Sequence, residues 1–568
     1  ENIAVSDDPA AGTAVSFDGA AGSFEVGPTD KTGRDNRAKG RLQYVNQHYL
    51  RYAETGEYFI KIGADSPENF LSYDDFDNTP DYGGLRKSWA PHLADWRTGD
   101  PTWRDGRGKG IIGAVNYLAI EGQNAFSFLT LNINGDDDNV FPYISDDRRD
   151  RLRMDCSKLA QWEILFEHAD REGMYLHFKT QETENDQLLD GGELGTERKL
   201  YYRELIARFA HHLALNWNIG EENSNTTAQQ IDFAEYFYRH DPYKNHIVLH
   251  THPGKHEEVY TPLLGQASKY TGPSLQNSWG NSHRVTQIWL EASAQAGKPW
   301  VVAHDEQNTA RIGVPHDTYT GSPAQSDIRN GVLWGNLMAG GAGVEYYFGY
   351  DLPHSDLTCQ DFRSRDRMWD YNRYAHQFFT NYLPFWQMKN HNELIGNTTD
   401  KRGLNCFADS GKVYAIYIAN ASLTPQLNLG TYNKSFRVQW YDPRNGGDLQ
   451  NGSVQTVNGP GEVSLGSPPK DNNLDWVILI KASVEECPEA GTPCDDGNPD
   501  TVNDVEDGNC NCAGVPAPQC PEAGTPCDDG NPYTINDVED GNCNCVGEPV
   551  PQCPEAGTPC DDGNPDTV

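Results

Sequence analysis

The sequence lacks several features that would point to other classes of protein. Its 568 residues contain no run of about 18 apolar residues, so no membrane insertion is expected. It has no Gly-rich phosphate loop, which argues against a nucleotide-binding open sheet. The His-Glu-x-x-His pattern of zinc hydrolases is also missing. The chain starts at Glu1 with neither Met nor a hydrophobic leader, and we therefore expect a mature form after signal removal.

Positive charge is scarce. The 45 Lys and Arg stand against 83 Asp and Glu, a formal net charge of −38. Residues 485–568 hold 20 of these acids and no Lys or Arg. This balance disfavours nucleic acid and anionic membranes as partners, because both repel an acidic surface.

Cysteine is rare outside the same stretch, which holds 10 of the 13. The others, Cys156, Cys359 and Cys406, are too scattered for a metal site, and we expect buried free thiols. A Cys-rich segment indicates an oxidising environment, so the sequence predicts a secreted or cell-surface protein.

Strand-like and helix-like stretches alternate from Tyr49 onward. Apolar runs predict buried strands at residues 58–62, 125–131, 174–178, 213–217, 247–250, 274–276, 300–303 and 344–348. Helical periodicity lies between them, at residues 156–172, 198–211, 227–239, 283–296 and 326–338. We predict an α/β fold, with an N-terminal extension (residues 1–40) and a (β/α)8 TIM barrel (residues 41–394). A doubly wound open sheet is the alternative.

Two further regions follow the barrel. Short alternating strands with Gly- and Asn-rich turns predict an antiparallel β-sandwich at residues 395–484. Residues 485–568 repeat every 33 residues, with copies opening at Cys487, Cys520 and Cys553. Units with so few large apolar residues need disulfides or metal, or else stay disordered. We predict a disulfide-rich tail; three pairings of Cys487, Cys494, Cys510 and Cys512 are open.

The repeats also concentrate oxygen ligands of the kind that a hard cation needs. We predict Ca²⁺ ligands at Asp495, Asp496, Asn498, Asp504, Asp528, Asp529, Asn531 and Asp537. A rigid array of this kind would serve self-assembly or anchoring to the cell surface. The alternative is a flexible acidic linker that is indifferent to metal.

Carboxylates follow two of the predicted barrel strands: Glu221 and Glu222 after the fourth, Glu306 after the seventh. Catalytic groups gather at that mouth of a (β/α)8 barrel. Glycosidic cleavage needs one carboxyl group to protonate the leaving oxygen and another to trap the sugar, and a spacing of about 5–5.5 Å gives retention. Each glutamate could instead cap the next helix, or pair with Arg311 in the case of Glu306.

Other residues at the strand ends suit contacts with a sugar. Trp279, for example, could stack on the apolar C–H face of a sugar ring. We predict substrate-binding roles for Glu221, Asn223, His177, Glu182, His250, His252, Trp279, His304 and Tyr346. The histidines could hold a metal instead, but their spacing is loose, and no cofactor is expected for catalysis.

These motifs carry a resemblance. Trp217 followed five residues later by Glu222 resembles the fourth strand of the large clan of retaining glycosidases, and residues 298–306 resemble its seventh strand. The resemblance implies that Glu222 is the acid/base and Glu306 the nucleophile. Glu221 stands where the clan usually has Asn, so the acid could be either of the two neighbours.

Longer stretches resemble a group of secreted bacterial barrel proteins related to the glycoside hydrolases; they are residues 125–143, 162–177, 180–186 and 199–225. Residues 436–447 look like the C-terminal domain of that group, labelled "putative collagen-binding", and we favour a domain that closes the barrel. The repeats resemble Cys-rich repeats of Bacteroidetes-type surface proteins.

The resemblance implies a secreted or surface-attached, retaining endo-glycoside hydrolase of a complex polysaccharide, with anionic, algal and plant chains among the candidates. The alternative is a non-catalytic cell-surface or filament-forming protein with a degenerate glycosidase barrel.

Overall fold

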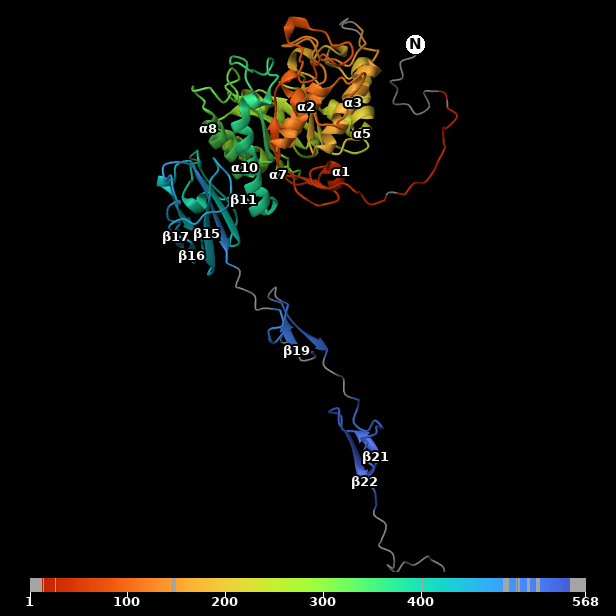
Figure 1. Cartoon of the computed structure of the whole chain (residues 1–568), viewed down its shortest axis with the longest axis vertical. Coiled ribbons are helices and arrows are strands. Elements are labelled where there is room, and N and C mark those ends of the chain that lie inside the picture. The colour runs from red at the N-terminus through yellow and green to blue at the C-terminus, as the bar shows by residue number, and fades with distance from the viewer. Residues whose placement is uncertain are drawn as a thin grey trace, which may run out of the picture. The chain divides into compact units, whose positions relative to one another are not determined.

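The computed structural model describes residues 13, 15–25, 27–144, 150–399, 402–483, 490–496, 498, 501–507, 511–516 and 521–551. The chain divides into two compact units, Glu1–Ser483 and Val484–Val568. Figure 1 colours the chain from its N-terminus to its C-terminus.

A closed barrel forms the centre of the first unit. Its eight strands are parallel and follow the order β10-β3-β4-β5-β6-β7-β8-β9. They are β3 (Lys61–Ala64), β4 (Ala125–Leu129), β5 (Tyr175–Lys179), β6 (Leu215–Asn218), β7 (His246–Thr251), β8 (Gly272–Ser278), β9 (Ala303–Asn308) and β10 (Gly343–Tyr346). The predicted (β/α)8 barrel is confirmed, and the open sheet is excluded.

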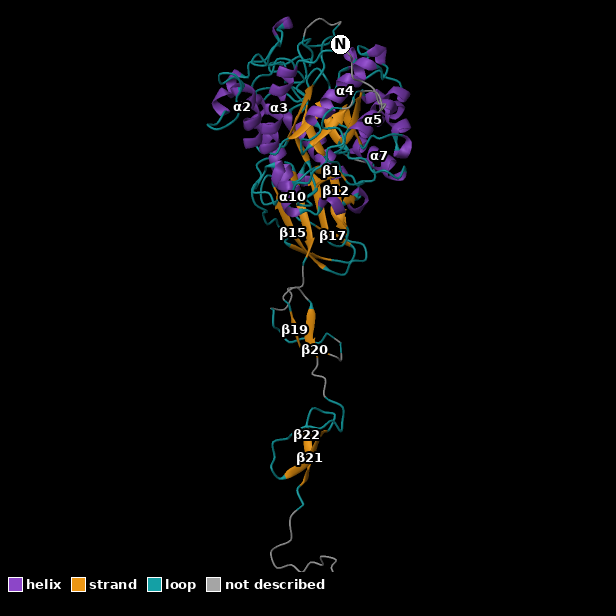
Figure 2. Ribbon diagram, turned by 90° about the vertical axis from the view of Figure 1, so that its right-hand side faces the viewer, coloured by secondary structure: helices purple, strands orange, loops and turns teal. Residues whose placement is uncertain are grey.

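Helices surround these strands (Figure 2). The longer ones are α2 (Lys109–Ile120), α3 (Cys156–Arg171), α4 (Thr196–Phe209), α5 (Thr227–His240), α7 (Ser282–Gln295) and α10 (Asp366–Tyr382). Local signals set their starts: the side chain of Asp155 caps α3, and Thr226 with Gln229 forms a capping box at α5. Strands such as β4 and β5 are buried on both faces because helices cover the outside of the barrel.

Two elements differ from the sequence prediction. Strand β9 is Ala303–Asn308, later than the predicted residues 300–303, because the ladder there uses polar residues whose side chains are buried inside the protein. The helix expected at residues 326–338 is split into α8 (Gln325–Ile328), a π-helical turn η8 (Arg329–Leu333) and α9 (Trp334–Ala339). Gly331 lies in that turn, where a Cβ would come within 2.3 Å of the Trp279 carbonyl oxygen.

A hairpin covers the N-terminal ends of the barrel strands. It consists of β1 (Leu42–Tyr44) and β2 (Leu50–Tyr52), and the short helix α1 (Asn36–Lys39) precedes it. The Leu42 amide donates to the Leu213 carbonyl at 2.7 Å, and the Tyr44 hydroxyl donates to the Pro299 carbonyl at 2.6 Å. The barrel is therefore closed at the end opposite to its C-terminal mouth.

Two antiparallel sheets follow the barrel. The larger has the order β11-β12-β13-β18-β15-β16, and β14 pairs with β17 in the smaller. Their bounds are β11 (Lys389–Asn390), β12 (Leu404–Asp409), β13 (Val413–Ile418), β14 (Gln426–Asn428), β15 (Ser435–Tyr441), β16 (Thr456–Asn458), β17 (Glu462–Ser464) and β18 (Trp476–Ala482). A separate apolar core that includes Ile416, Leu427 and Trp476 lies between the sheets.

The larger sheet contacts the barrel domain through buried side chains. Arg329 of η8 donates twice to Asp475, at 3.0 and 2.9 Å, and both side chains are 7% exposed. Trp334 stacks on Tyr417 with the ring centroids 5.1 Å apart. These contacts fix the sheet against the segment η8–α9 of the barrel domain; a role in closing the barrel stays a prediction.

The second unit contains two similar hairpins, β19 (Thr501–Glu506) with β20 (Cys512–Pro516), and β21 (Thr534–Glu539) with β22 (Cys545–Pro549). Each copy has its own disulfide, Cys494–Cys512 in the first and Cys527–Cys545 in the second, and the two bridges are at equivalent positions. The other pairings fall partly on Cys487, Cys510, Cys520 and Cys553, which lie outside the described residues.

The three remaining cysteines are not all buried. Cys359 and Cys406 are buried as expected, but Cys156 is exposed because it occupies the first turn of α3, on the outside of the barrel. None of the helices in the described part of the chain has the length and apolarity that crossing a membrane requires.

Candidate active site

The turn after β6 separates two neighbouring carboxylates. Gly220 has φ 118° and Glu222 has φ 45°, both in the left-handed region. For a residue other than glycine this backbone costs about 1–3 kcal/mol, and such strain concentrates at functional sites. The Glu221 amide donates to the Gln181 carbonyl at 2.9 Å, which ties the turn to the end of β5. The side chains of Glu221 and Glu222 consequently have different surroundings.

Glu222 faces the next two strands of the barrel. Gln276 of β8 donates from Nε2 to its Oε1, and Nδ1 of His252 lies 2.9 Å from the same oxygen. Burial and the neighbouring Glu306 carboxylate raise the pKa of Glu222, whereas His250 and Gln276 act in the opposite direction. Because its side chain is 27% exposed, Glu222 combines access to solvent with a bias toward the protonated form.

Glu306 owes its position to a β-bulge. Along the β8–β9 ladder Leu275 pairs with His304 and Gln276 pairs with Glu306, so Asp305 has no partner on β8. A bulge re-aims the side chains around it. Here it brings Glu306 beside Gln276, the residue that contacts Glu222.

His250 of β7 lies between carboxylates of two strands. Its Nε2 is 3.2 Å from Oε2 of Glu306, and its Nδ1 is 3.6 Å from Oε1 of Glu221. One oxygen of Glu221, one ring nitrogen of His250 and one oxygen of Glu306 lie within 4.8 Å of one another. A cation could be held at this point, but the three groups also suit a catalytic carboxylate kept in place by an imidazole.

The floor of the mouth holds a buried ammonium group with three carboxylates. Nζ of Lys179 lies 2.7 Å from Glu221, 3.1 Å from Glu68 and 3.1 Å from Asp65. Burial and the nearby Glu68 raise the pKa of Glu221 well above its ordinary value, although Lys179 opposes them. Burial also disfavours the charged form of Glu68, but Lys179 and a hydrogen bond with Glu221 outweigh it and lower the pKa of Glu68. These opposite directions favour the protonated form of Glu221 over that of Glu68.

A second buried network lies deeper in the barrel. Nζ of Lys61 is 2.6 Å from Asp305 and 2.8 Å from Glu345, and Nδ1 of His177 is 2.6 Å from Glu345. Asn218 reaches the other ring nitrogen of His177 at 3.1 Å. His177 is fully buried, so the structure places it in this support rather than on the surface of the mouth.

The other predicted substrate-binding residues are not gathered in one place. His304 is buried, with Nδ1 2.6 Å from Ser282 Oγ, and Tyr346 is buried beside Trp369. Glu182 accepts from Asn132 at 3.0 Å, Asn223 accepts from Gln230 at 3.0 Å, and Trp279 lies under the Arg402 guanidinium at 4.5 Å. Glu221, Glu222, His250, His252 and Glu306 are the predicted residues that the structure brings together.

Sequence reasoning missed Gln276, Lys61 and Lys179. The one available signal was a lysine at or next to an otherwise apolar buried strand, since a buried Lys needs a carboxylate partner. Gln276 gave no such signal because glutamine is equally common on exposed surfaces.

In the tail, oxygens of Asp495, Asp496 and Asp504 lie within 4.8 Å of one another. The Asn498 amide donates to Asp496 at 2.8 Å, so that carboxylate also shapes a turn. In the second copy Asp528 and Asp529 accept from the amides of Gly530 and Asn531, and the Asp529 amide donates to Asp537 at 3.4 Å.

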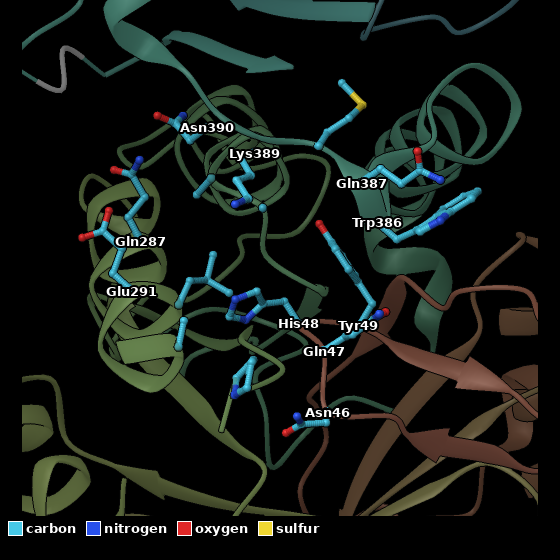
Figure 3. A pocket seen from close by; sticks show the side chains of 16 residues that line it. Asn46, Gln47, His48, Tyr49, Gln287, Glu291, Trp386, Gln387, Lys389 and Asn390 are labelled. Atoms are coloured by element: carbon cyan, nitrogen blue, oxygen red, sulfur yellow. The ribbon is translucent and has the colours of Figure 1, made fainter. Parts of the chain in front are cut away.

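A cavity of about 440 Å³ lies at the opposite, N-terminal end of the barrel. Figure 3 shows His48 and Tyr49 from the β1–β2 turn, Gln287 and Glu291 from α7, and Trp386 around it. Its lining includes no residue of the carboxylate group at the mouth. We therefore assign it no part in the chemistry.

Comparison with known proteins agrees with this architecture. The family model described as "Putative collagen-binding domain of a collagenase" matches residues 391–481. A search of curated proteins returned no match.

Several solved structures are similar. A glycoside hydrolase family 5 protein from Bacteroides vulgatus is 15% identical with a TM-score of 0.55, over 78% of this chain and 93% of that one. A protein described as a glycoside hydrolase is 14% identical with a TM-score of 0.56, over 78% and 98% of the two chains. A "putative glycoside hydrolase" from Bacteroides vulgatus is 12% identical with a TM-score of 0.53, over 80% and 84%. The chain thus has a glycoside hydrolase-like TIM barrel, followed by a domain that matches the collagen-binding model.

Proposed function

We propose that the barrel is a retaining endo-glycoside hydrolase that acts on a complex polysaccharide, with Glu222 as acid/base and Glu306 as nucleophile. The observation that carries the proposal is the meeting of these two glutamates, from the fourth and seventh barrel strands, beside Gln276 and His250. Glu306 would attack the anomeric carbon while Glu222 gives its proton to the leaving oxygen. Water, deprotonated by Glu222, would then release the sugar from Glu306.

Glu222 suits the acid better than Glu221 does. The Glu221 side chain is 3% exposed and 2.7 Å from Lys179, so it is held in the floor of the mouth. The Glu222 side chain is 27% exposed, and a leaving oxygen can reach it. We propose that Glu221 positions Lys179 and His250 instead of touching the sugar.

The charges around the mouth favour a neutral chain over an anionic one. Asp65, Glu68 and Glu221 all lie within 3.1 Å of Lys179, and the negative charge of Glu68 adds to burial in raising the pKa of the nearby Glu182 well above its ordinary value. A carboxylated or sulfated sugar would meet repulsion there.

A screen of the purified full chain tests the proposal. Neutral and anionic polysaccharides from algae and plants are incubated with the parent and with Glu306→Gln, and new reducing ends are counted. We expect mid-sized oligosaccharides first, from a neutral chain, and none from the variant. Early monosaccharide would contradict endo action, and equal release by the variant would contradict Glu306 as the nucleophile. No release by the parent would favour the non-catalytic surface protein.

We also propose that the tail binds Ca²⁺ and serves anchoring or self-assembly of a secreted or surface protein. Oδ1 of Asp504 and Oδ1 of Asp537 are buried and have no hydrogen-bond partner among the described residues, at equivalent places in the two copies. Such oxygens suit a hard cation. Calorimetry on the full chain should show heat when Ca²⁺ is added, and a chelator should speed protease cleavage of the tail. If both effects are absent, the flexible acidic linker is the better interpretation.

A further inference from the structure

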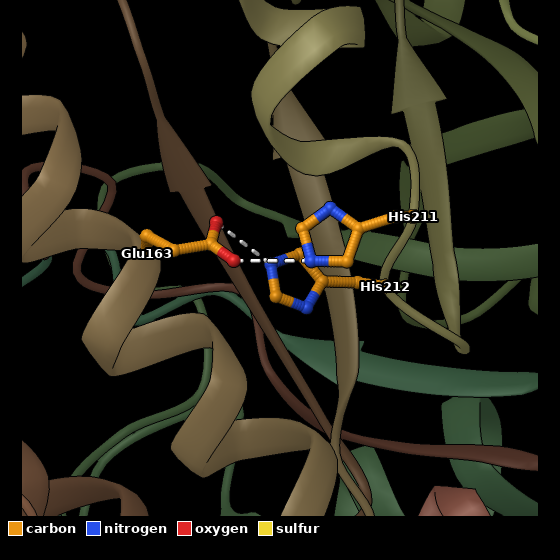
Figure 4. A group of neighbouring side chains, drawn as sticks. All are labelled: Glu163, His211 and His212. Carbon is orange, nitrogen blue, oxygen red and sulfur yellow. Dashed lines mark hydrogen bonds and ion pairs between the residues drawn. The ribbon is translucent and has the colours of Figure 1, made fainter.

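A group of two histidines and a glutamate lies far from the mouth of the barrel. Glu163 is in α3, and His211 with His212 lies between α4 and β6. Nε2 of His211 is 3.0 Å from Oε1 of Glu163, and Nε2 of His212 is 3.3 Å from Oε2. Figure 4 shows both rings directed at the one carboxylate.

We propose that Glu163, His211 and His212 form a Zn²⁺ site that is separate from the carbohydrate chemistry. One ligand atom from each residue lies within 4.8 Å of the other two. Ligands at the usual zinc distances of about 2.0–2.2 Å are roughly 3.3 Å apart in a tetrahedron. The spacings of 3.0 Å from His211 to Oε1 and 3.3 Å from His212 to Oε2 of Glu163 are close to that value, so small shifts would bring each nitrogen and one carboxylate oxygen to an ion.

The surrounding residues orient these ligands as they do in zinc proteins. Nδ1 of His212 is 2.8 Å from Oδ2 of Asp170, which leaves Nε2 for the metal. A histidine that bonds a carboxylate through its second nitrogen is the common arrangement behind a zinc ligand. Two neutral rings, the Glu163 and Asp170 carboxylates and Zn²⁺ also sum to zero charge.

The backbone of the two histidines is held as well. The Arg41 guanidinium donates to the carbonyl oxygens of His211 and His212, at 2.8 and 2.7 Å. The rings lie with their centroids 4.4 Å apart. Preorganisation of this kind lowers the cost of binding an ion.

The two ends of the site differ in exposure. The His212 side chain is 1% exposed, whereas His211 is 47% and Glu163 28% exposed. A metal can therefore enter from solvent, and water can complete its coordination. Bound zinc would join α3 to the segment that leads into β6, which indicates a stabilising role.

Zinc titration of the chelator-treated full chain tests the proposal. Calorimetry compares the parent with His211→Ala and Glu163→Gln, because both side chains are partly exposed and their loss leaves the buried His212–Asp170 contact intact. The matched control is His391→Ala, since His391 also pairs with a glutamate, Glu393 at 2.8 Å, and no second histidine of the described residues joins that pair. The variant Glu306→Gln shows whether any of the bound zinc is held instead by the group of Glu221, His250 and Glu306 at the mouth of the barrel.

We expect His211→Ala and Glu163→Gln to lose one zinc equivalent, or to bind it at least about tenfold more weakly. Zinc should raise the melting temperature of the parent and the control but not that of the two variants, since a ligand of the folded state stabilises it. Unchanged binding in His211→Ala would overturn the site, and so would a parent that binds no zinc.

Discussion

His250 and Glu306 meet at the mouth of the barrel, with Nε2 of the imidazole 3.2 Å from Oε2 of the carboxylate. They come from β7 and β9, and the strand between them, β8, carries the Gln276 that contacts Glu222. The consecutive strands β6 to β9 thus supply both proposed catalytic carboxylates, or lead into them, and carry the side chains that contact them.

Replacement of the two glutamates should have different effects on activity. Glu306→Gln removes the nucleophile and is expected to abolish turnover of every substrate. Glu222→Gln should lower kcat on polysaccharide by about 10²–10⁴-fold but spare much of the activity on aryl glycosides, whose leaving groups need little protonation. Initial rates on both substrate types measure this. If Glu221→Gln shows the Glu222 pattern and Glu222→Gln is fully active, the acid is the neighbouring residue.

Gln276→Leu should move the alkaline limb of the pH profile to higher pH. The hydrogen bond from Gln276 favours the ionised form of Glu222, so its loss raises the pKa of Glu222 further. A general acid works while protonated, and its pKa in the free enzyme sets the alkaline limb of kcat/KM. The control is Gln287→Leu, at the cavity on the other end of the barrel. A shift to lower pH, or the same shift in the control, would contradict the role of Gln276.

Asp475→Asn should weaken the joint between the barrel and the sheets that follow it. It leaves the Arg329 guanidinium buried without its bidentate partner, and breaking a buried pair costs about 3–5 kcal/mol. Urea unfolding followed by Trp fluorescence measures the loss. Asp351→Asn is the comparison, because its pair with Arg311 is exposed and worth about 1 kcal/mol or less. Equal losses of unfolding free energy in the two variants would show that burial of the Arg329–Asp475 pair adds nothing to stability.

The Cys494–Cys512 bridge should control protease resistance of the first repeat. It closes a loop with a sequence separation of 18, for which chain entropy gives about 3 kcal/mol. In the full chain, Cys494→Ser with Cys512→Ser is expected to speed cleavage within residues 490–516 and to leave barrel melting unchanged. Cys156→Ser, at an exposed free thiol, should do neither. Resistance equal to that of the parent would mean that the repeat is ordered without its bridge.

Much of the fold was accessible from the sequence because its signals are local. Buried strands and amphipathic helices each carry their own period, and α3 and α5 begin at residues with capping side chains. The Cys repeat likewise predicted a disulfide-rich tail. Strand β9 was misplaced because buried His, Asp, Glu and Gln side chains have no apolar period.

By itself the sequence determined the barrel, the sheets after it, and the presence of carboxylates at the C-terminal ends of the fourth and seventh strands. Only the tertiary structure decided which of those carboxylates meet. Lys179 joins Glu68 and Glu221 from 111 and 42 residues away, and the bulge at Asp305 aligns Glu306 with Gln276. Such contacts depend on register and barrel closure, because charge and distance act through space and leave no periodic mark along the chain.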